Sequence, residues 1–323
     1  MSDLHIGDKY RNFLKRFGYV PYNPDALVAV AEFAYKQKNE YDAIIVSGDV
    51  VSVAYKDNLV LAKSFFETDT GLVHNREWLY SESKPTLASC QKPVIIMPGN
   101  HDKFKGILGF PVKKPFENVF KKYWKSDRIQ VYKLPSENDP QLGIVCVDLT
   151  LNSFIDSTVL GGHFGQGRLY DDEIEDLKNI TKKTKEMSAV TWMIHFAPCV
   201  EEHFELEDIE EMRLLNSETL IKTARELGIR YIFCGHTHIH HNYMVSKDIE
   251  VLCCGTTACV EGNKVDTTMF LHEIDIDGLD ITSINSKRVN YDIVRQEFTY
   301  DIVRQEFTYE ENDDKQMLFG WLK

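Results

Sequence analysis

The chain has 323 residues, 43% of them apolar, which is enough for one large α/β domain or two small ones. A net charge of −13 and an isoelectric point near 5.3 make long nucleic acid and anionic membranes poor partners. No apolar stretch reaches the roughly 18 residues that a membrane-spanning helix needs, so we expect no transmembrane segment. A small anionic ligand stays compatible with this charge, because bound metal ions can reverse the field inside one cleft.

The seven cysteines are odd in number, and several lie inside apolar runs such as GIVCV and YIFCG. This usage is typical of reduced core thiols in a cytosolic protein, so we predict a cytoplasmic location. Zinc binding by Cys253, Cys254 and Cys259 is the less favoured alternative, because these residues lack the two-residue spacer of common zinc knuckles.

Short apolar runs rich in β-branched residues alternate with segments of helical period along the first three quarters of the chain. The apolar runs predict strands at 43–47, 93–97, 143–148, 189–195 and 230–234. Helices are predicted at 24–38, 58–67, 116–124, 171–187 and 217–227. This alternation is typical of an α/β layered core with covered strands. From residue 241 onward, turns separate apolar runs that lack a helical period, which predicts antiparallel strands.

Two long connections, 68–91 and 151–170, have no clear period, and connections of this length in a compact domain are often functional. Near the end of the chain, the nonapeptide YDIVRQEFT at 291–299 is repeated at 300–308. We therefore predict one domain over residues 1–288, followed by a tail over 289–323 that carries a local duplication. A strand that pairs in two registers is the alternative, because an odd shift exchanges the two faces of a strand.

Polar residues cluster where the predicted strands end. The carboxyl ends of strands in an open α/β sheet converge on one crevice, so we expect these side chains to meet. Imidazole, carboxylate and amide oxygen together suit borderline first-row metals, and two such metals about 3.5–4 Å apart can clamp an in-line displacement. The residues are Asp3 and His5 in SDLHIG, Asp49 in VSGDVV, Asn100, His101 and Asp102 in PGNHD, His195 in MIHFAP, and His236 and His238 in CGHTH.

Glycine precedes three of these polar groups, at Gly48, Gly99 and Gly235. We expect it to let the backbone turn without a Cβ clash. Within GNHD, Asn100 can bind metal, His101 can face a substrate and Asp102 can orient His101.

This order of motifs resembles the calcineurin-like metallophosphoesterase superfamily, whose series is D-x-H, G-D, G-N-H-D or G-N-H-E, an isolated H, and G-H-x-H. The resemblance covers positions 3 to 238 and implies a four-layer αββα sandwich with mixed sheets and antiparallel C-terminal strands. Family members carry an apolar strand before D-x-H, whereas only Met1 and Ser2 precede Asp3 here. We therefore expect that residues upstream of Met1, with a first strand or a targeting signal, are missing from this sequence.

The resemblance also implies a set of roles. Two metal ions are expected, manganese or iron first and zinc as a further candidate. One ion would be held by Asp3, His5, Asp49 and His238, and the other by Asp49, Asn100, His195 and His236, with Asp49 bridging. His101 would stabilise developing charge or protonate the leaving group, and Asp102 would be its partner.

By the same resemblance, the chain is expected to hydrolyse a small phosphodiester or pyrophosphate through in-line attack by a metal-bridging hydroxide, like class III cyclic-nucleotide phosphodiesterases. The acidic run EEHFELEDIEE at 201–211 disfavours long DNA. Three alternatives stay open: a nucleotide-sugar pyrophosphatase of lipid biosynthesis, a phosphomonoesterase, and a non-catalytic metal-bound scaffold. The candidate substrate contacts are His163 and Arg168 in one long connection and His74 and Arg76 in the other.

Overall fold

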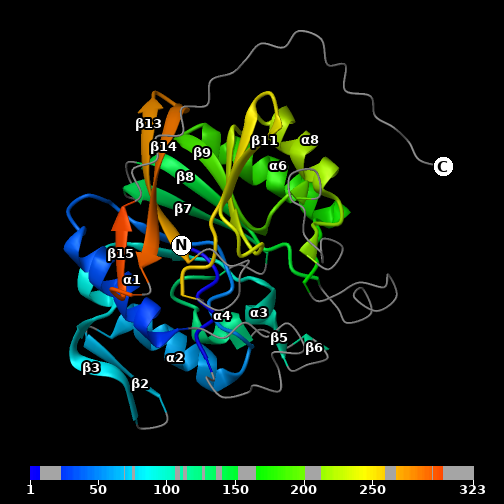
Figure 1. Ribbon diagram of the computed structural model, residues 1–323. Helices are drawn as coiled ribbons and strands as arrows, with labels where there is room; N and C mark the ends of the chain where they lie inside the picture. The colour runs from blue at the N-terminus through cyan, green and yellow to red at the C-terminus, as the bar shows by residue number, and fades with distance from the viewer. Residues whose placement is uncertain are drawn as a thin grey trace.

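The fold is known from a computed structural model (Figure 1). It describes residues 1–7, 23–68, 70–74, 77–105, 110–111, 115–125, 128–135, 140–151, 165–200, 212–258, 267–292 and 294–300. Two layers of strands lie between two layers of helices, with α6 and α8 on one side and α1 and α2 on the other. Among the described residues, no helix is long and apolar enough to cross a membrane.

The main helices begin and end where the sequence places capping and charged residues. Asn23 caps α1, since its side chain accepts hydrogen bonds from the backbone of Asp25 and Ala26, and Pro24 occupies the first turn. Helix α6 has three acidic residues in its first turn and three lysines in its last, which complements the helix dipole. The bounds are α1 Pro24–Lys36, α2 Lys56–Glu67, α6 Asp171–Lys185 and α8 Ser217–Glu226.

The larger sheet has six strands in the order β11-β12-β10-β9-β8-β7. The four central strands are parallel, and the two edge strands run antiparallel to their neighbours, so the sheet is mixed. Their bounds are β7 Ile129–Pro135, β8 Pro140–Val147, β9 Ala189–Phe196, β10 Tyr231–Gly235, β11 His241–Ser246 and β12 Ile249–Cys253.

Side chains of the central strands alternate between two cores. Trp192 and Ile232 lie in the core that α6 and α8 cover. Met193 and Phe233, one residue further along each strand, lie in the other core, which reaches the second layer of strands and α1 and α2. This two-sided burial explains why the sequence shows these strands as continuous apolar runs.

The second layer of strands combines parallel and antiparallel parts. Strand β1 (Ile44–Val46) pairs in parallel with β4 (Val94–Ile96), and residues 1–6 lie beside 45–52 through backbone hydrogen bonds. Strands β13 (Thr268–Asp277), β14 (Asp280–Asp292) and β15 (Glu297–Tyr300) form an antiparallel sheet. The predicted four-layer αββα arrangement with antiparallel C-terminal strands is confirmed.

Several elements differ from the sequence predictions. Residues 68–91 are not an irregular loop, because they include the hairpin β2–β3 and the short helix η2. Strand β7 was not predicted, and α4 is shorter than the predicted helix at 116–124. The bounds are β2 Thr70–His74, β3 Glu77–Pro85, η2 Leu87–Cys90, α3 Asn100–Lys103, β5 Phe104–Lys105, β6 Phe110–Pro111 and α4 Pro115–Val119.

The predicted tail also begins later than residue 289, because β14 continues to Asp292 and β15 follows it. The first copy of the nonapeptide provides the end of β14, the turn and most of β15. Phe298 is buried, and its ring and that of Tyr300 contact Phe33 of α1. Only Tyr300 of the second copy belongs to the described residues.

The cysteines agree with the predicted reduced state. Six of the seven are buried free thiols, at positions 90, 146, 199, 234, 253 and 254. Cys259 lies outside the described residues.

Candidate metal centre

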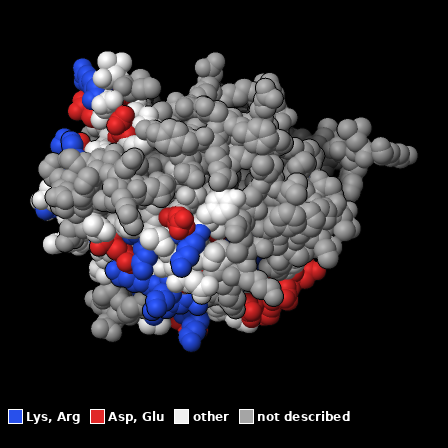
Figure 2. Space-filling view, turned by 90° about the horizontal axis from the view of Figure 1, so that it is seen from below, with Lys and Arg blue, Asp and Glu red and all other residues white. Residues whose placement is uncertain are grey.

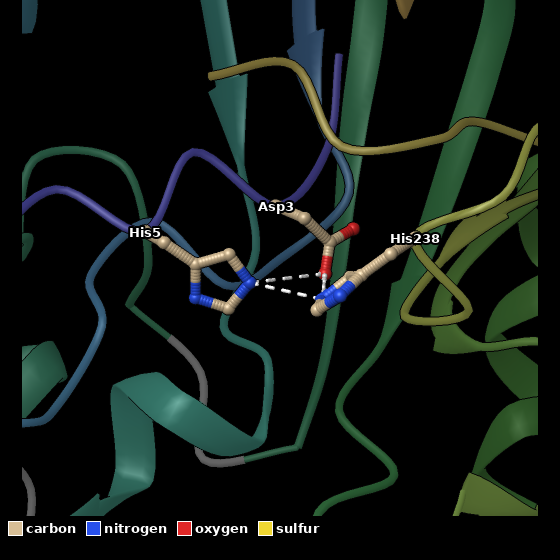
Figure 3. A group of neighbouring side chains, drawn as sticks. All are labelled: Asp3, His5 and His238. Atoms are coloured by element: carbon tan, nitrogen blue, oxygen red, sulfur yellow. Dashed lines mark hydrogen bonds and ion pairs between the residues drawn. The ribbon is translucent and has the colours of Figure 1, made fainter. Parts of the chain in front are cut away.

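The first cluster of ligand-type atoms joins the N-terminal segment to the GHTH turn (Figure 3). Nε2 of His5 lies 3.0 Å from Nε2 of His238, and these atoms lie 3.7 and 3.3 Å from Oδ1 of Asp3. The three side chains point toward one another, although Asp3 and His238 are separated by more than two hundred positions in the sequence. Such a group can hold one metal ion.

A second cluster lies at the carboxyl ends of β1 and β9 and beside α3. Nε2 of His195 lies 3.1 Å from Oδ2 of Asp49 and 3.1 Å from Oδ1 of Asn100. His236 completes this cluster, since it offers a ring nitrogen within 4.8 Å of the ligand-type atoms of Asp49 and His195. Nδ1 of His195 is 2.8 Å from the carbonyl oxygen of Ser47, which fixes the orientation of the ring.

Asp49 lies between the two clusters. Its carboxylate lies close to the ligand-type atoms of His195 and His236 on one side and to those of His5 and His101 on the other. Oδ1 of Asp49 accepts a hydrogen bond of 2.8 Å from the backbone of His101. The seven candidate ligands that the motifs predict are therefore brought to one place by the fold.

Five of these seven residues have left-handed backbone conformations. Their φ angles are 51° at Asp3, 48° at His5, 50° at Asp49, 73° at His236 and 57° at His238. Non-glycine residues rarely adopt positive φ, and each such residue costs on the order of 1–3 kcal/mol. Strain of this kind clusters at functional sites, where the surrounding structure holds it in place.

The glycines before these residues serve close packing as well as turning. Gly48 has a φ of 108°, and a Cβ atom there would overlap the ring of His195. Gly99 has an ordinary negative φ, and a Cβ atom there would overlap the carboxylate of Asp49. The predicted turning role therefore holds at Gly48, whereas at Gly99 the requirement is room for Asp49.

The electrostatics of the clusters suit metal binding. Burial raises the pKa of the Asp3 and Asp49 carboxyls, but the surrounding imidazoles outweigh burial and hold each pKa below its usual value. Burial lowers the pKa of His5 well below 6.5 and that of His236 to about 3. Ionised carboxylates and neutral imidazoles are the forms that bind metal. His195 differs: burial opposes its protonation, but the Asp49 carboxylate raises its pKa to about 10.

Unsatisfied polar atoms lie in both clusters. Among the described residues, Oδ1 of Asp3, Oδ2 of Asp49 and Nε2 of His236 are buried without a hydrogen bond, although an imidazole nitrogen lies within 3.3 Å of each carboxylate oxygen. Burying such atoms is costly unless another group satisfies them. Two carboxylate oxygens and an imidazole nitrogen are the donor types that first-row metal ions accept, so the residues fit a metal centre.

A family model for the calcineurin-like phosphoesterases matches residues 1–240, about three quarters of the chain. The chain belongs to this family. It is therefore a metallophosphoesterase, a hydrolase of phosphoric ester bonds, as the motif order predicted. A comparison with curated protein sequences gives no match.

A comparison with solved structures finds proteins that are similar to this calcineurin-like phosphoesterase. A dimetal phosphatase from Danio rerio has a TM-score of 0.54 and 13% identity, with 90% of each chain covered. GAP50, the anchor in the inner membrane complex of Plasmodium, has a TM-score of 0.51 and 14% identity, covering 90% of this chain and 82% of GAP50. A protein named as a 5′-nucleotidase from Staphylococcus aureus has a TM-score of 0.48 and 14% identity. The match covers 97% of this chain and 55% of the Staphylococcus aureus protein.

The structure shows backbone contacts for the side chains of His101 and Asp102. Nδ1 of His101 lies 2.7 Å from the carbonyl oxygen of Ser52, which orients the ring. The Asp102 carboxylate accepts three backbone hydrogen bonds, from Val50 at 3.1 Å, Val51 at 2.9 Å and Gly99 at 2.9 Å. Asp102 thus ties the GNHD turn to the GD loop, and its role in orienting His101 stays a prediction.

The structure describes only two of the four candidate substrate contacts, Arg168 and His74. The guanidinium of Arg168 lies 5.5 Å from the centre of the Tyr170 ring. His74 ends β2 in the hairpin. His163 and Arg76 lie outside the described residues, as does the acidic run at 201–211. Their contact with a substrate stays a prediction.

Sequence reasoning missed the residues that hold the candidate ligands in position. Ser47 and Ser52 act through backbone carbonyls, which no side-chain pattern reveals. Thr256 donates a hydrogen bond of 2.6 Å to the carbonyl oxygen of Asp3. The sequence around it, CCGTTACV, carries two adjacent threonines after a predicted strand, which is the one available signal.

Proposed function

We propose that this phosphoesterase uses two metal ions to hydrolyse a small phosphodiester or pyrophosphate. The observation that carries the proposal is the convergence of buried ligand-type atoms from Asp3, Asp49 and His236 on one region. The family membership supports the reaction class, and the dinuclear arrangement is inferred from Asp49, which groups with His195 and His236 and also with His5 of the first cluster.

The two clusters would each hold one ion. Asp3, His5, Asp49 and His238 would hold the first, and Asp49, Asn100, His195 and His236 the second, with Asp49 shared. When bound, the ions supply a water of lowered pKa and neutralise charge on the phosphoryl oxygens. Manganese and iron suit this mixture of imidazole, carboxylate and amide oxygen, and zinc is the further candidate.

His101 is the proposed acid–base residue. Its Nδ1 faces the Ser52 carbonyl, which only accepts hydrogen bonds, so Nδ1 carries a proton. Nε2 is then the nitrogen that meets a substrate, 4.0 Å from Oδ2 of Asp49. The side chain is 14% exposed, so a bound phosphoester can reach it. As an imidazolium, His101 can donate a proton to the leaving oxygen or stabilise charge there.

The charge distribution supports a small substrate. The net charge of −13 disfavours an extended polyanion, but Lys and Arg side chains gather on one part of the described surface (Figure 2). The charge therefore does not prevent a small anion from binding locally. A cytoplasmic location is proposed with this substrate class, on the basis of the reduced cysteines.

The test is hydrolysis of a small panel by the full chain, with Mn²⁺ and with chelator. The panel contains bis(p-nitrophenyl) phosphate, p-nitrophenyl phosphate, cyclic nucleotides and a UDP-sugar, and Asp49→Asn is the inactive control. We expect manganese-dependent turnover of the diester to exceed that of the monoester. Faster cleavage of the UDP-sugar or of the monoester would instead favour the pyrophosphatase or the phosphomonoesterase alternative. No turnover with any metal would favour the scaffold.

A further inference from the structure

Residues 1–6 carry two candidate ligands and are held by the chain from two sides. On one side, the backbone of Asp3 donates to Gly48 at 3.1 Å and that of His5 donates to Asp49 at 3.0 Å. On the other side lies the segment between β12 and β13, which contains Thr256 and Thr257. The N-terminal segment therefore lies in the interior of the strand layer, with neighbours from distant parts of the sequence.

The two threonines contact this segment through three hydrogen bonds. The backbone nitrogen of Ser2 donates to Oγ1 of Thr257 at 3.0 Å, and the nitrogen of Thr257 donates to the carbonyl of Ser2 at 2.9 Å. Oγ1 of Thr256 donates to the carbonyl of Asp3 at 2.6 Å. All four residues are fully buried, so water cannot replace these bonds.

The threonines are themselves fixed to β13. Oγ1 of Thr257 donates to the carbonyl of Thr268 at 3.1 Å, and the nitrogen of Thr268 donates to the carbonyl of Thr256 at 2.9 Å. A hydroxyl has one proton to donate and can still accept, so Thr257 serves Thr268 and Ser2 at the same time. A rigid strand thereby holds the peptide groups on both sides of the Asp3 Cα atom.

Asp3 needs this support because its conformation is unfavourable by itself. Its φ of 51° lies in the left-handed region, and its Oδ2 accepts a hydrogen bond of 3.0 Å from the backbone of His236 and another from the hydroxyl of Ser2. These contacts leave Oδ1 facing His5 and His238. A rotation of the Ser2–Asp3 peptide would move this oxygen away from the cluster.

We propose that Thr256 and Thr257 are positioning residues for the metal site formed with Asp3, His5 and His238. This inference rests on the proposed function and names a further part of the same site. The second cluster depends on Asn100, His195 and His236, which come from other elements, and among these only His236 contacts Asp3, through its backbone nitrogen. Loss of a threonine hydroxyl should therefore affect the first site more than the second. Residues that orient metal ligands typically change metal affinity by about 10- to 100-fold.

The first experiment measures amide hydrogen exchange in the metal-free chain. Thr256→Val and Thr257→Val remove one hydroxyl each with little change in volume. Thr191→Val is the matched control, because Thr191 is equally buried and donates one hydrogen bond of 2.9 Å to Tyr231 in the other sheet. We expect the amides of Asp3, His5 and Ile6 to exchange at least about tenfold faster in the two variants and unchanged in the control. Unchanged exchange in the variants would overturn the proposal.

The second experiment measures Mn²⁺ binding and its electron paramagnetic resonance spectrum. We expect wild type and Thr191→Val to bind two ions with an exchange-coupled signal. Thr256→Val and Thr257→Val should bind one ion with a mononuclear signal and the other about 10- to 100-fold more weakly. Thr257→Ser should restore the coupled signal, which a loss of general stability would not explain.

The two proposals fail in different ways. Wild-type protein that binds neither manganese, iron nor zinc would overturn the proposed function. Two full-affinity ions in Thr256→Val and Thr257→Val, beside faster exchange at residues 3–6, would overturn the positioning role alone.

Discussion

A Cβ atom on Gly99 would lie 2.5 Å from the backbone nitrogen of Asp49 and even closer to its carboxylate oxygen Oδ1. The shared candidate ligand thus fills the space that any side chain at Gly99 would need. Gly99→Ala should displace the Asp49 carboxylate and lower both metal content and turnover, the latter by about 10²-fold, the scale expected for a displacement near 1 Å. Metal analysis and diester hydrolysis measure both effects.

Gly143→Ala is the control for this substitution. A Cβ atom there would overlap the side chain of Thr184 and lie 2.9 Å from Oγ of Ser188, so the steric conflict is similar but lies in β8. We expect a loss of about 1–3 kcal/mol in the free energy of unfolding, with metal content unchanged. Equal metal content in both glycine variants would contradict the packing argument.

Substitutions of candidate ligands and of His101 should separate metal binding from acid–base chemistry. Asp49→Asn and His236→Ala each remove a buried ligand-type atom, so both should lose metal and turnover. His101→Ala should retain metal and lose turnover by about 10²–10⁴-fold, the usual scale for one acid–base group. Metal content of the purified variants, measured beside their rates, decides the assignment. Equal metal loss in all three variants would refute the role given to His101.

His272, which lies outside the metal centre, should make the stability of the fold depend on pH. Desolvation of this half-buried ring lowers its pKa to about 3, and its Nδ1 lies 2.8 Å from the hydroxyl of Ser286. The folded state therefore holds this imidazole neutral. The contribution of neutral His272 to the free energy of unfolding is fully present above pH 6.5, its ordinary pKa. This contribution is lost as the pH falls toward 3, by at most about 1.4 kcal/mol per pH unit.

Replacing His272 should reduce this acid sensitivity. His272→Phe keeps a ring that can stack on Phe270 and removes the titrating group. Urea unfolding of the metal-free chain at pH 7 and pH 5 should show a smaller loss of stability for the variant than for wild type. The same loss in both proteins would show that His272 does not titrate as described.

The duplicated nonapeptide predicts how the chain responds to loss of Phe298. If the second copy is only a local duplication, Phe298→Ala should destabilise the fold by about 3 kcal/mol, and Phe307→Ala should have no effect. If residues 306–309 can replace 297–300 beside β14, the connection grows from 4 to 13 residues. The loss would then be limited to about 1 kcal/mol, the cost of closing the longer loop.

Urea unfolding of both single variants and the double variant separates these cases. We expect the double variant to match Phe298→Ala. A double variant that is clearly less stable than Phe298→Ala would establish that the second copy substitutes for the first.

Asp49, Asn100, His195, His236 and His238 could be predicted from sequence because they follow apolar runs, whereas Asp3 and His5 were predicted from the order of the motifs. Convergence of strand ends then brings Asp49, Asn100 and His195 together without any knowledge of distances. The layered core could also be predicted, because strands buried on both faces appear as continuous apolar runs. The order of the motifs along the chain also predicted the family.

The supporting contacts could not be predicted in the same way. Ser52 orients His101 through its carbonyl oxygen, and every residue has such an oxygen. Asp102 accepts from the backbone of Val50 and Val51, 52 and 51 positions away, and a sequence motif carries no record of such long-range contacts. The hairpin β2–β3 escaped prediction because residues 68–91 show no clear period.

The measurement that tests the central claim most directly is a titration of metal-free protein with Mn²⁺, followed by diester hydrolysis at each step. Two clusters with Asp49 between them predict that turnover needs two equivalents of metal per chain and that Asp49→Asn shows no turnover at any equivalent. Full turnover after a single equivalent, or no turnover after two, would contradict a dinuclear centre.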